Sequence, residues 1–238
     1  MSTPGTVAPG GRLAVMTSAA HDDAPAPPRI ELVEPEGLIG GDVDQLARLG
    51  QAEGMRFAGA TLADVDLAGG SIVECRLDQV TLDGVDFTGA TVAESVITGL
   101  GAAHLDARRT TWRDVEIADS RIGAAELYDA GLDGVRISTS KLDLVNLRGA
   151  RLADVDIVDT HLVELDLGGA EVTRLRLRGC RVDTLDLTEA RLADVDLRGA
   201  QLSRIVGLDR IGGAVISPEQ LVELAESFAA QLGVRVVE

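Results

Sequence analysis

A period of five residues runs through this chain and limits its fold more than any other feature. From Phe57 to Leu202 every fifth residue is apolar, over thirty consecutive positions without a slip of register. A second series of mostly small apolar residues, such as Ala60, Val65 and Cys75, stands two residues before many of them. A helix repeats after about 3.6 residues and a strand after two, so neither produces this pattern. The period predicts a chain that turns a corner every five residues and points two residues inward on each side.

Four such sides close a square coil of twenty residues, and coils of this kind stack into a rod. Neighbouring coils then lie about 4.8 Å apart, so thirty sides amount to about 7.5 coils and a rod of about 36 Å. Aromatic residues make up only 2% of the chain, which indicates a narrow, aliphatic core. We therefore predict an all-β fold, a quadrilateral β-helix whose interior is filled by side chains and offers no pocket.

The repeated segments resemble the A(D/N)Lxx motif of the pentapeptide-repeat family. LADVDL occurs at 62–67 and again at 192–197, and LADVDI occurs at 152–157. The resemblance covers about residues 57–206 and implies a right-handed quadrilateral β-helix. This chain departs from the family by often placing Val or Leu where the family prefers Ala. Because no loop interrupts the register, the chain is most similar to the loop-free family members that imitate DNA, inhibit gyrase and confer quinolone resistance.

The repeat divides the chain into four parts. Residues 1–28 are rich in Pro, Gly, Ala and Ser and predict a disordered tail. Residues 29–54 predict an N-terminal cap, with a strand-like segment at 29–33 and a weak helix around 43–49. Residues 55–206 predict the β-helix. Residues 207–238 predict a short capping or dimerisation helix that begins at Ser217, followed by a strand at 234–237.

One face of the predicted C-terminal helix is apolar. It carries Leu221, Leu224, Phe228 and Leu232. This face either covers the last coil or forms a contact between two copies, and one face can serve both purposes. The family resemblance implies a homodimer through this helix.

The residues that usually carry chemistry do not form a recognisable site. The rod histidines, His104 and His161, occupy outward positions 57 residues apart, which disfavours a joint metal site. Cys75 and Cys180 are separated by 105 residues, so about 25 Å at the coil spacing, beyond the roughly 7 Å that a disulfide spans. We find no phosphate-binding loop, nucleophile elbow or zinc-protease motif. We predict two free, inward-facing thiols, no catalytic residues, no metal and no cofactor.

Residues twenty apart stack in columns on the outside of the predicted rod, and two columns are acidic. The first acidic column reads Asp66, Asp86, Asp106, Glu126, Asn146, Asp166, Asp186, and the second reads Glu74, Glu94, Asp114, Gly134, Asp154, Arg174, Asp194. Stacked like charges repel and destabilise the fold, so the presence of these acids needs an explanation. Either the carboxylates bond to nearby turn backbone and add solubility, or they imitate the charge of DNA.

The charge balance both supports and limits the second interpretation. The formal net charge is −17, but residues 136–206 hold 12 acids against 11 bases and are nearly neutral. Mimicry is therefore expected mainly toward the N-terminal half. Together with the resemblance, this predicts a non-catalytic protein that binds a DNA-handling enzyme, DNA gyrase first, without binding nucleic acid itself. The alternative is an interaction scaffold unrelated to DNA. No apolar run is long enough for a membrane span, and we expect a cytoplasmic protein.

Overall fold

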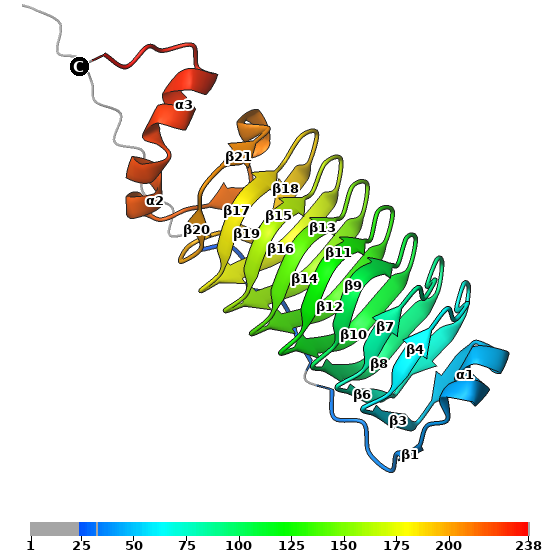
Figure 1. The fold of residues 1–238 in the computed structure, drawn as a ribbon. Coiled ribbons are helices and arrows are strands. Elements are labelled where there is room, and N and C mark those ends of the chain that lie inside the picture. The colour runs from blue at the N-terminus through cyan, green and yellow to red at the C-terminus, as the bar shows by residue number, and fades with distance from the viewer. Residues whose placement is uncertain (1–23, 32, 238) are drawn as a thin grey trace, which may run out of the picture.

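The protein is a parallel β-helix in the computed structural model, which describes residues 24–31 and 33–237 (Figure 1). Its strands form two sheets that run along the rod. The larger sheet follows the order β1-β3-β6-β8-β10-β12-β14-β16-β19-β22, and the smaller one follows β20-β17-β15-β13-β11-β9-β7-β4. Each coil therefore contributes to both sheets, and the predicted β-helix is confirmed.

The strands of the two sheets have the following bounds. The larger sheet contains β1 (Ile39–Gly40), β2 (Gln51–Glu53), β3 (Met55–Ala58), β5 (Ser71–Val73), β6 (Arg76–Asp78), β8 (Thr91–Thr98), β10 (Thr111–Ala118), β12 (Gly131–Ser138), β14 (Arg151–Val158), β16 (Glu171–Arg178), β18 (Arg191–Ala193), β19 (Val195–Asp196) and β22 (Ala214–Val215). The smaller sheet contains β4 (Thr61–Ala63), β7 (Thr81–Asp83), β9 (Gly101–Asp106), β11 (Arg121–Glu126), β13 (Lys141–Asn146), β15 (His161–Asp166), β17 (Arg181–Asp186), β20 (Gln201–Leu202) and β21 (Ile205–Val206).

The register between neighbouring coils is twenty residues, as the period of five requires. Thr111 pairs with Gly131, and Gly131 pairs with Arg151. The same offset persists until Leu185 pairs with Ile205. It then shortens, because Val195 pairs with Ala214 in β22. Since β1 and β22 continue the larger sheet beyond the repeats, the stack is longer than the 7.5 coils that the repeat alone predicts.

Corners of the coil adopt the left-handed backbone conformation. Positive φ values occur at most positions of a five-residue series that runs from 54 to 199, for example at Glu94 (48°), Asp114 (51°) and Asp154 (54°). This conformation is costly for most residues and suits Gly, Asp and Asn best. The Asp114 carboxylate lies over Gly134, one coil later, where a larger side chain would collide with it. The corner therefore selects short polar residues and glycine, which explains part of the acidic content of the second column.

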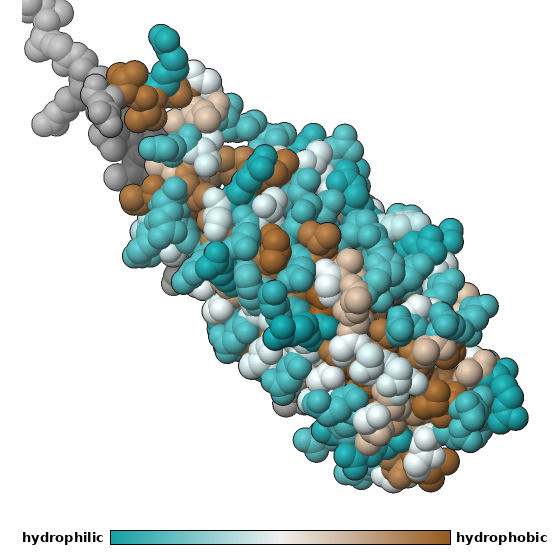
Figure 2. Space-filling view, viewed as in Figure 1, coloured by the Kyte–Doolittle hydropathy of each residue, from teal (hydrophilic) through white to brown (hydrophobic). Residues whose placement is uncertain are grey.

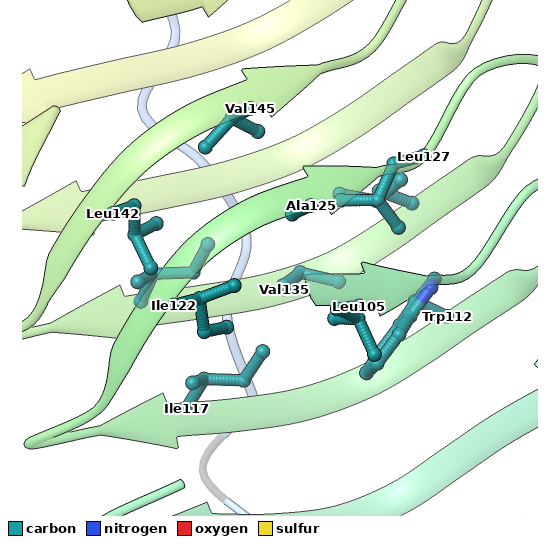
Figure 3. A pocket seen from close by; sticks show the side chains of 11 residues that line it. Leu105, Trp112, Ile117, Ile122, Ala125, Leu127, Val135, Leu142 and Val145 are labelled. Carbon is teal, nitrogen blue, oxygen red and sulfur yellow. The ribbon is translucent and has the colours of Figure 1, made fainter. Parts of the chain in front are cut away.

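The core consists of the thirty-position apolar series and its smaller companions. All but three of the thirty side chains are buried, and the other three, Leu127, Ile137 and Leu192, pack against them. A cavity of about 40 Å³ remains beside Trp112, lined by aliphatic side chains such as Leu105, Ile122 and Leu142 (Figure 3). It is an apolar packing defect around the only tryptophan, in a core that is otherwise narrow.

A ladder of buried hydroxyl groups links successive coils at one inner corner. Ser120 Oγ accepts the Leu100 N–H, Ser140 Oγ accepts the Ser120 N–H, and Thr160 Oγ1 accepts the Ser140 N–H, over 3.0, 3.0 and 3.4 Å. Each hydroxyl also donates to the carbonyl two residues before it. Cys180 occupies the next rung, and its thiol donates to the Arg178 carbonyl. Buried polar groups are tolerated here because each one has a partner.

The N-terminal segment lies along the outside of the rod. Residues 24–37, apart from 32, are extended without helix or strand, and we call this segment the strap. The Ala26 N–H donates to Asp194 near the C-terminal end of the rod, and the Arg29 N–H donates to Asp154 two coils earlier. The strap, blue in Figure 1, continues to β1 at the opposite end.

This placement corrects two expectations from the sequence. Residues 24–28 lie against the rod, although composition predicted disorder up to residue 28. The described residues of 29–33 form no strand: the Arg29 N–H bonds to the Asp154 side chain, and none of these residues pairs with a sheet edge. Residues 1–23 lie outside the described residues. The predicted helix is present as α1 (Val43–Leu49), which Asp42 caps by accepting the N–H groups of Asp44 and Gln45.

The C-terminal end closes the rod with helices. After η1 (Leu208–Arg210), the chain forms α2 (Pro218–Glu223) and α3 (Ala225–Gln231). The predicted single helix is thus interrupted at Leu224. The predicted capping box is present, since Ser217 and Gln220 bond to each other's main-chain N–H. The Gln220 amide also donates to the Leu197 and Ala200 carbonyls, both at 2.7 Å. The strand predicted at 234–237 does not form, because no strand edge lies beside it.

Candidate interaction surface

The first acidic column lies at the ends of the strands of the smaller sheet and at the turns that follow them. Its carboxylates accept main-chain N–H groups two residues later: Ala68 donates to Asp66 at 2.9 Å, and Thr88 donates to Asp86 at 2.7 Å. Asp166 and Asp186 do the same for Gly168 and Thr188. Hydrogen bonding to Thr88 lowers the pKa of Asp86. The structure therefore supports the expectation that these side chains bond to turn backbone.

Arginines neutralise part of the first acidic column. Arg108 Nη2 lies 2.7 Å from Asp106, and Arg148 Nη1 lies 2.9 Å from Asp166. Arg108 also stacks on the Tyr128 ring, 5.9 Å from its centre. The other four acids of this column, Asp66, Asp86, Glu126 and Asp186, form no ion pair within the described residues. Three of these four lie in the N-terminal half of the rod.

The second acidic column runs along corners of the larger sheet, beneath the strap. Its ends, Glu74 and Asp194, are exposed, whereas Gly134 and Asp154 in its middle are buried. Asp154 accepts two hydrogen bonds of 2.6 Å from Arg174 and one of 2.8 Å from the Arg29 N–H. These contacts lower the pKa of Asp154, with the Arg174 hydrogen bond as the main cause. Asp154 is therefore a paired, covered carboxylate and not part of an open acidic face.

The strap adds acids that the repeat pattern did not predict. Between strap and rod lies a groove lined by six carboxylates, those of Glu31, Glu34, Glu36, Glu74, Glu94 and Asp114. Partial burial raises the pKa of Asp114, and repulsion from Glu31 adds to this rise. Because the five-residue period does not extend into the strap, nothing in the sequence placed its three glutamates beside the column.

The C-terminal half of the rod carries tightly paired charges. Arg176 lies 2.8 Å from Asp156, whose side chain is almost fully buried, and Arg198 lies 2.7 Å from Asp196. The Arg198 hydrogen bond lowers the pKa of Asp196. The sequence showed this region as nearly neutral, and the structure shows that most of its basic side chains pair with an acid. The unpaired carboxylates are thus concentrated toward the N-terminal half.

The four residues predicted for dimerisation divide between two environments. Leu224 is 4% exposed and belongs to the packing of the C-terminal cap, and Phe228 is half-buried. Leu221 and Leu232 are 53% and 79% exposed. Val222, Val234, Val236 and Val237 are also exposed, and Figure 2 shows hydrophobic residues at this end of the rod. The cap therefore leaves an apolar surface that nothing in the described residues covers.

The thiols and histidines lie as isolated groups. Cys75 and Cys180 are free and buried, and burial raises the pKa of both thiols. His161 lies 3.2 Å from Asp183, while His104 belongs to a different coil. Within the described residues, no three His, Cys, Asp or Glu side chains gather closely enough to hold a metal ion. None of the helices in this part of the chain is long and apolar enough to cross a membrane.

Comparison with known proteins identifies the repeat. The family model for pentapeptide repeats matches residues 54–99 in eight copies. Residues 54–99 of this chain therefore match the pentapeptide-repeat family. The repeats of the chain extend beyond the matched segment, since the twenty-residue register of the solenoid continues to Ile205. No curated protein matches this chain.

Solved structures include several similar solenoids. A trypsin-treated variant of QnrB1, described as a plasmid-mediated fluoroquinolone resistance protein, is 13% identical over 79% of this chain and 100% of its own, with a TM-score of 0.31. Full-length QnrB1 is 12% identical over 75% and 94%, with a TM-score of 0.29. HetL from the cyanobacterium Nostoc sp. strain PCC 7120, described as involved in heterocyst differentiation regulation, is 20% identical over 70% and 89%, with a TM-score of 0.23. Such distant likenesses carry no argument about function.

Proposed function

We propose that this protein is a non-catalytic binding protein that presents an acidic, DNA-like face to a DNA-handling enzyme. DNA gyrase is the first candidate partner, and binding inhibits the enzyme or protects it from quinolones. The protein acts in the cytoplasm as a homodimer joined through its C-terminal helices, and it does not bind DNA itself.

One observation carries this proposal: four acids of the first column, Asp66, Asp86, Glu126 and Asp186, stand at whole-coil intervals without an ion pair in the described residues. A groove that binds DNA is positively charged and gains affinity from a row of negative charges. Duplex DNA carries one charge per about 1.7 Å, whereas one column offers one per coil, about 4.8 Å apart. The six-carboxylate groove beside the strap supplies further charge at the same end of the rod.

The test is a supercoiling assay with purified gyrase that compares the parent with the triple variant Asp66→Asn, Asp86→Asn, Glu126→Gln. Asparagine keeps the oxygen that accepts the turn N–H, as Asn146 shows by accepting the Arg148 N–H at 3.2 Å. The variant should fold normally and inhibit more weakly, most clearly at low salt, where exposed charges are least screened.

A matched control removes three exposed acids from the C-terminal cap, Asp209→Asn, Glu223→Gln and Glu226→Gln. It changes the net charge equally and should inhibit as the parent does. If the parent leaves supercoiling and quinolone-induced cleavage unchanged at tens of micromolar, gyrase is not the partner. If both triple variants inhibit equally, the first column does not act by charge mimicry.

The second candidate is an interaction scaffold unrelated to DNA. The paired charges of the C-terminal half favour it, since Arg174 with Asp154 and Arg176 with Asp156 cancel the field that a mimic needs. A binding partner that the parent and the triple variant of the first acidic column bind equally well, at both low and high salt, would support this candidate.

A further inference from the structure

The cavity beside Trp112 has a clear origin in the column of side chains that faces it. In the smaller sheet, Leu105, Ala125 and Val145 occupy the same inward position in three successive coils, and Ala125 is the smallest of them. All three line the cavity, together with the indole of Trp112 from the larger sheet (Figure 3). A rigid indole cannot fold into the space that the short Ala125 side chain leaves, so about 40 Å³ stays unfilled. This space departs from the fully filled interior that the repeat alone predicts.

The cavity offers no side-chain group that could hold a water molecule. Among the described side chains that line it, only that of Trp112 carries a polar atom, and its indole N–H already donates to Thr110 Oγ1 at 2.7 Å. The main chain of the strands around it is paired within the two sheets. A buried water needs two to four polar partners, and apolar cavities without them stay dry even where a water would fit.

A dry apolar space favours an apolar occupant of its own size. Lining atoms that face a void lose the dispersion contacts that a closely fitting atom would restore. Engineered apolar cavities of about 150 Å³ bind benzene or xenon. This cavity has about a quarter of that volume, so it admits only a molecule of very few non-hydrogen atoms. Two of its lining side chains, Leu127 and Ile137, are half-buried, which places the cavity close to the surface and leaves a short route for entry.

We propose that this cavity is a binding site for a small apolar molecule, of the size of xenon or another dissolved gas, held between β10, β11 and their neighbours by dispersion contacts alone. Binding stabilises the rod, because the ligand fits the folded state and finds no such space in the unfolded chain. The site is separate from the acidic columns, so its test is independent of any partner of the rod.

Xenon is the probe, and the single tryptophan of the chain is the reporter. A heavy atom in contact with an indole quenches its fluorescence, and Trp112 is only 6% exposed, which limits quenching from bulk solution. Rising xenon pressure should therefore quench Trp112 along a saturation curve. At the xenon concentration that half-saturates the quenching, the folding equilibrium constant should be about twice its value without xenon, as measured by urea unfolding.

Two substitutions in the same column change the cavity in opposite directions. Ala125→Val adds the volume that Val145→Ala removes, and the next coil already carries valine at this position. Ala125→Val should abolish the saturable quenching, whereas Val145→Ala should lower the xenon concentration needed for half-saturation several-fold.

Saturable quenching that is absent from the parent, or equal in the parent and Ala125→Val, would overturn the proposal. If Ala125→Val does not fold, the comparison of the parent with Val145→Ala decides. A xenon affinity of the enlarged cavity no greater than that of the parent would then refute a site shaped by this column.

Discussion

The hydroxyl ladder gives the sharpest test of how the coils are held together. Ser140 is 6% exposed, and its Oγ accepts the Ser120 N–H at 3.0 Å and donates to the Ser138 carbonyl at 2.7 Å. In Ser140→Ala the Ser138 carbonyl keeps a second partner, since it also accepts the Asp119 N–H. The Ser120 N–H loses its partner in a buried position. A buried donor without a partner costs about 1–3 kcal/mol, so this is the expected loss of stability.

The chain itself supplies the matched control. Thr160 stands in the same column, one coil later, with the same pair of hydrogen bonds, so Ser140→Thr should keep the ladder. The added methyl group costs less than the lost acceptor if the corner accommodates it as it does at Thr160. We expect the order of stability to be parent, then Ser140→Thr, then Ser140→Ala.

Urea unfolding followed by circular dichroism measures the global effect, and hydrogen exchange at the Ser120 amide measures the local one. Solenoids can unfold in parts, so the local measurement guards against an incomplete two-state transition. An Ala variant with the unfolding midpoint of the Thr variant, and with unchanged exchange at Ser120, would show that the ladder contributes nothing to the stacking.

Further predictions concern register, thiols, acid stability and assembly. Deletion of residues 138–157 removes one coil in register and should leave a folded rod by circular dichroism, whereas an eighteen-residue deletion from the same start should not fold. The two buried cysteines should react with a thiol reagent only slowly until urea is added. Asp154 has a lowered pKa, so its stabilisation is present above the ordinary carboxylate range and is lost as pH falls through the lower folded value. Asp154→Asn should therefore flatten the acid side of the stability curve. Light scattering should show a dimer, and Leu221→Glu with Leu232→Glu should make it monomeric without unfolding the cap, since both side chains are exposed; a monomeric parent at micromolar concentration would contradict the proposed dimer.

The rod could be predicted from the sequence because every coil repeats the same pattern of inward-facing apolar residues. A wrong register would turn Leu62, Leu82 and the rest of the series outward. Thirty consecutive apolar positions are therefore compatible with only one register of the coil. Several contacts between coils also follow once the coil length is fixed at twenty. Arg174 stands twenty residues after Asp154, and Arg176 stands twenty after Asp156. Both of these charge pairs were therefore predictable from the sequence.

The strap and the end of the chain were not predictable in this way. A single extended segment makes each contact once, so no periodicity marks Ala26 or Arg29 as partners of the rod. The valine-rich segment at 234–237 has strand-forming composition, but a strand needs an edge to pair with. Its first N–H, that of Val234, bonds back to Ala229 instead. Local preference was outweighed by the absence of a neighbouring strand at this end of the described chain.

The acidic columns show how a requirement of the fold can be separated from a requirement of function. At the first column the turn needs an oxygen that accepts the N–H two residues later, and Asn146 meets that need without a charge. The fold therefore explains an Asp or Asn at these positions, but not why six of the seven are acids. At the second column the corner backbone favours short polar residues, yet Glu74 occupies it with a longer, charged side chain. Charge that the backbone does not require, and that no arginine within the described residues pairs with, remains at Asp66, Asp86 and Glu74. All three lie in the N-terminal half of the rod, which is where the proposed function is to be tested.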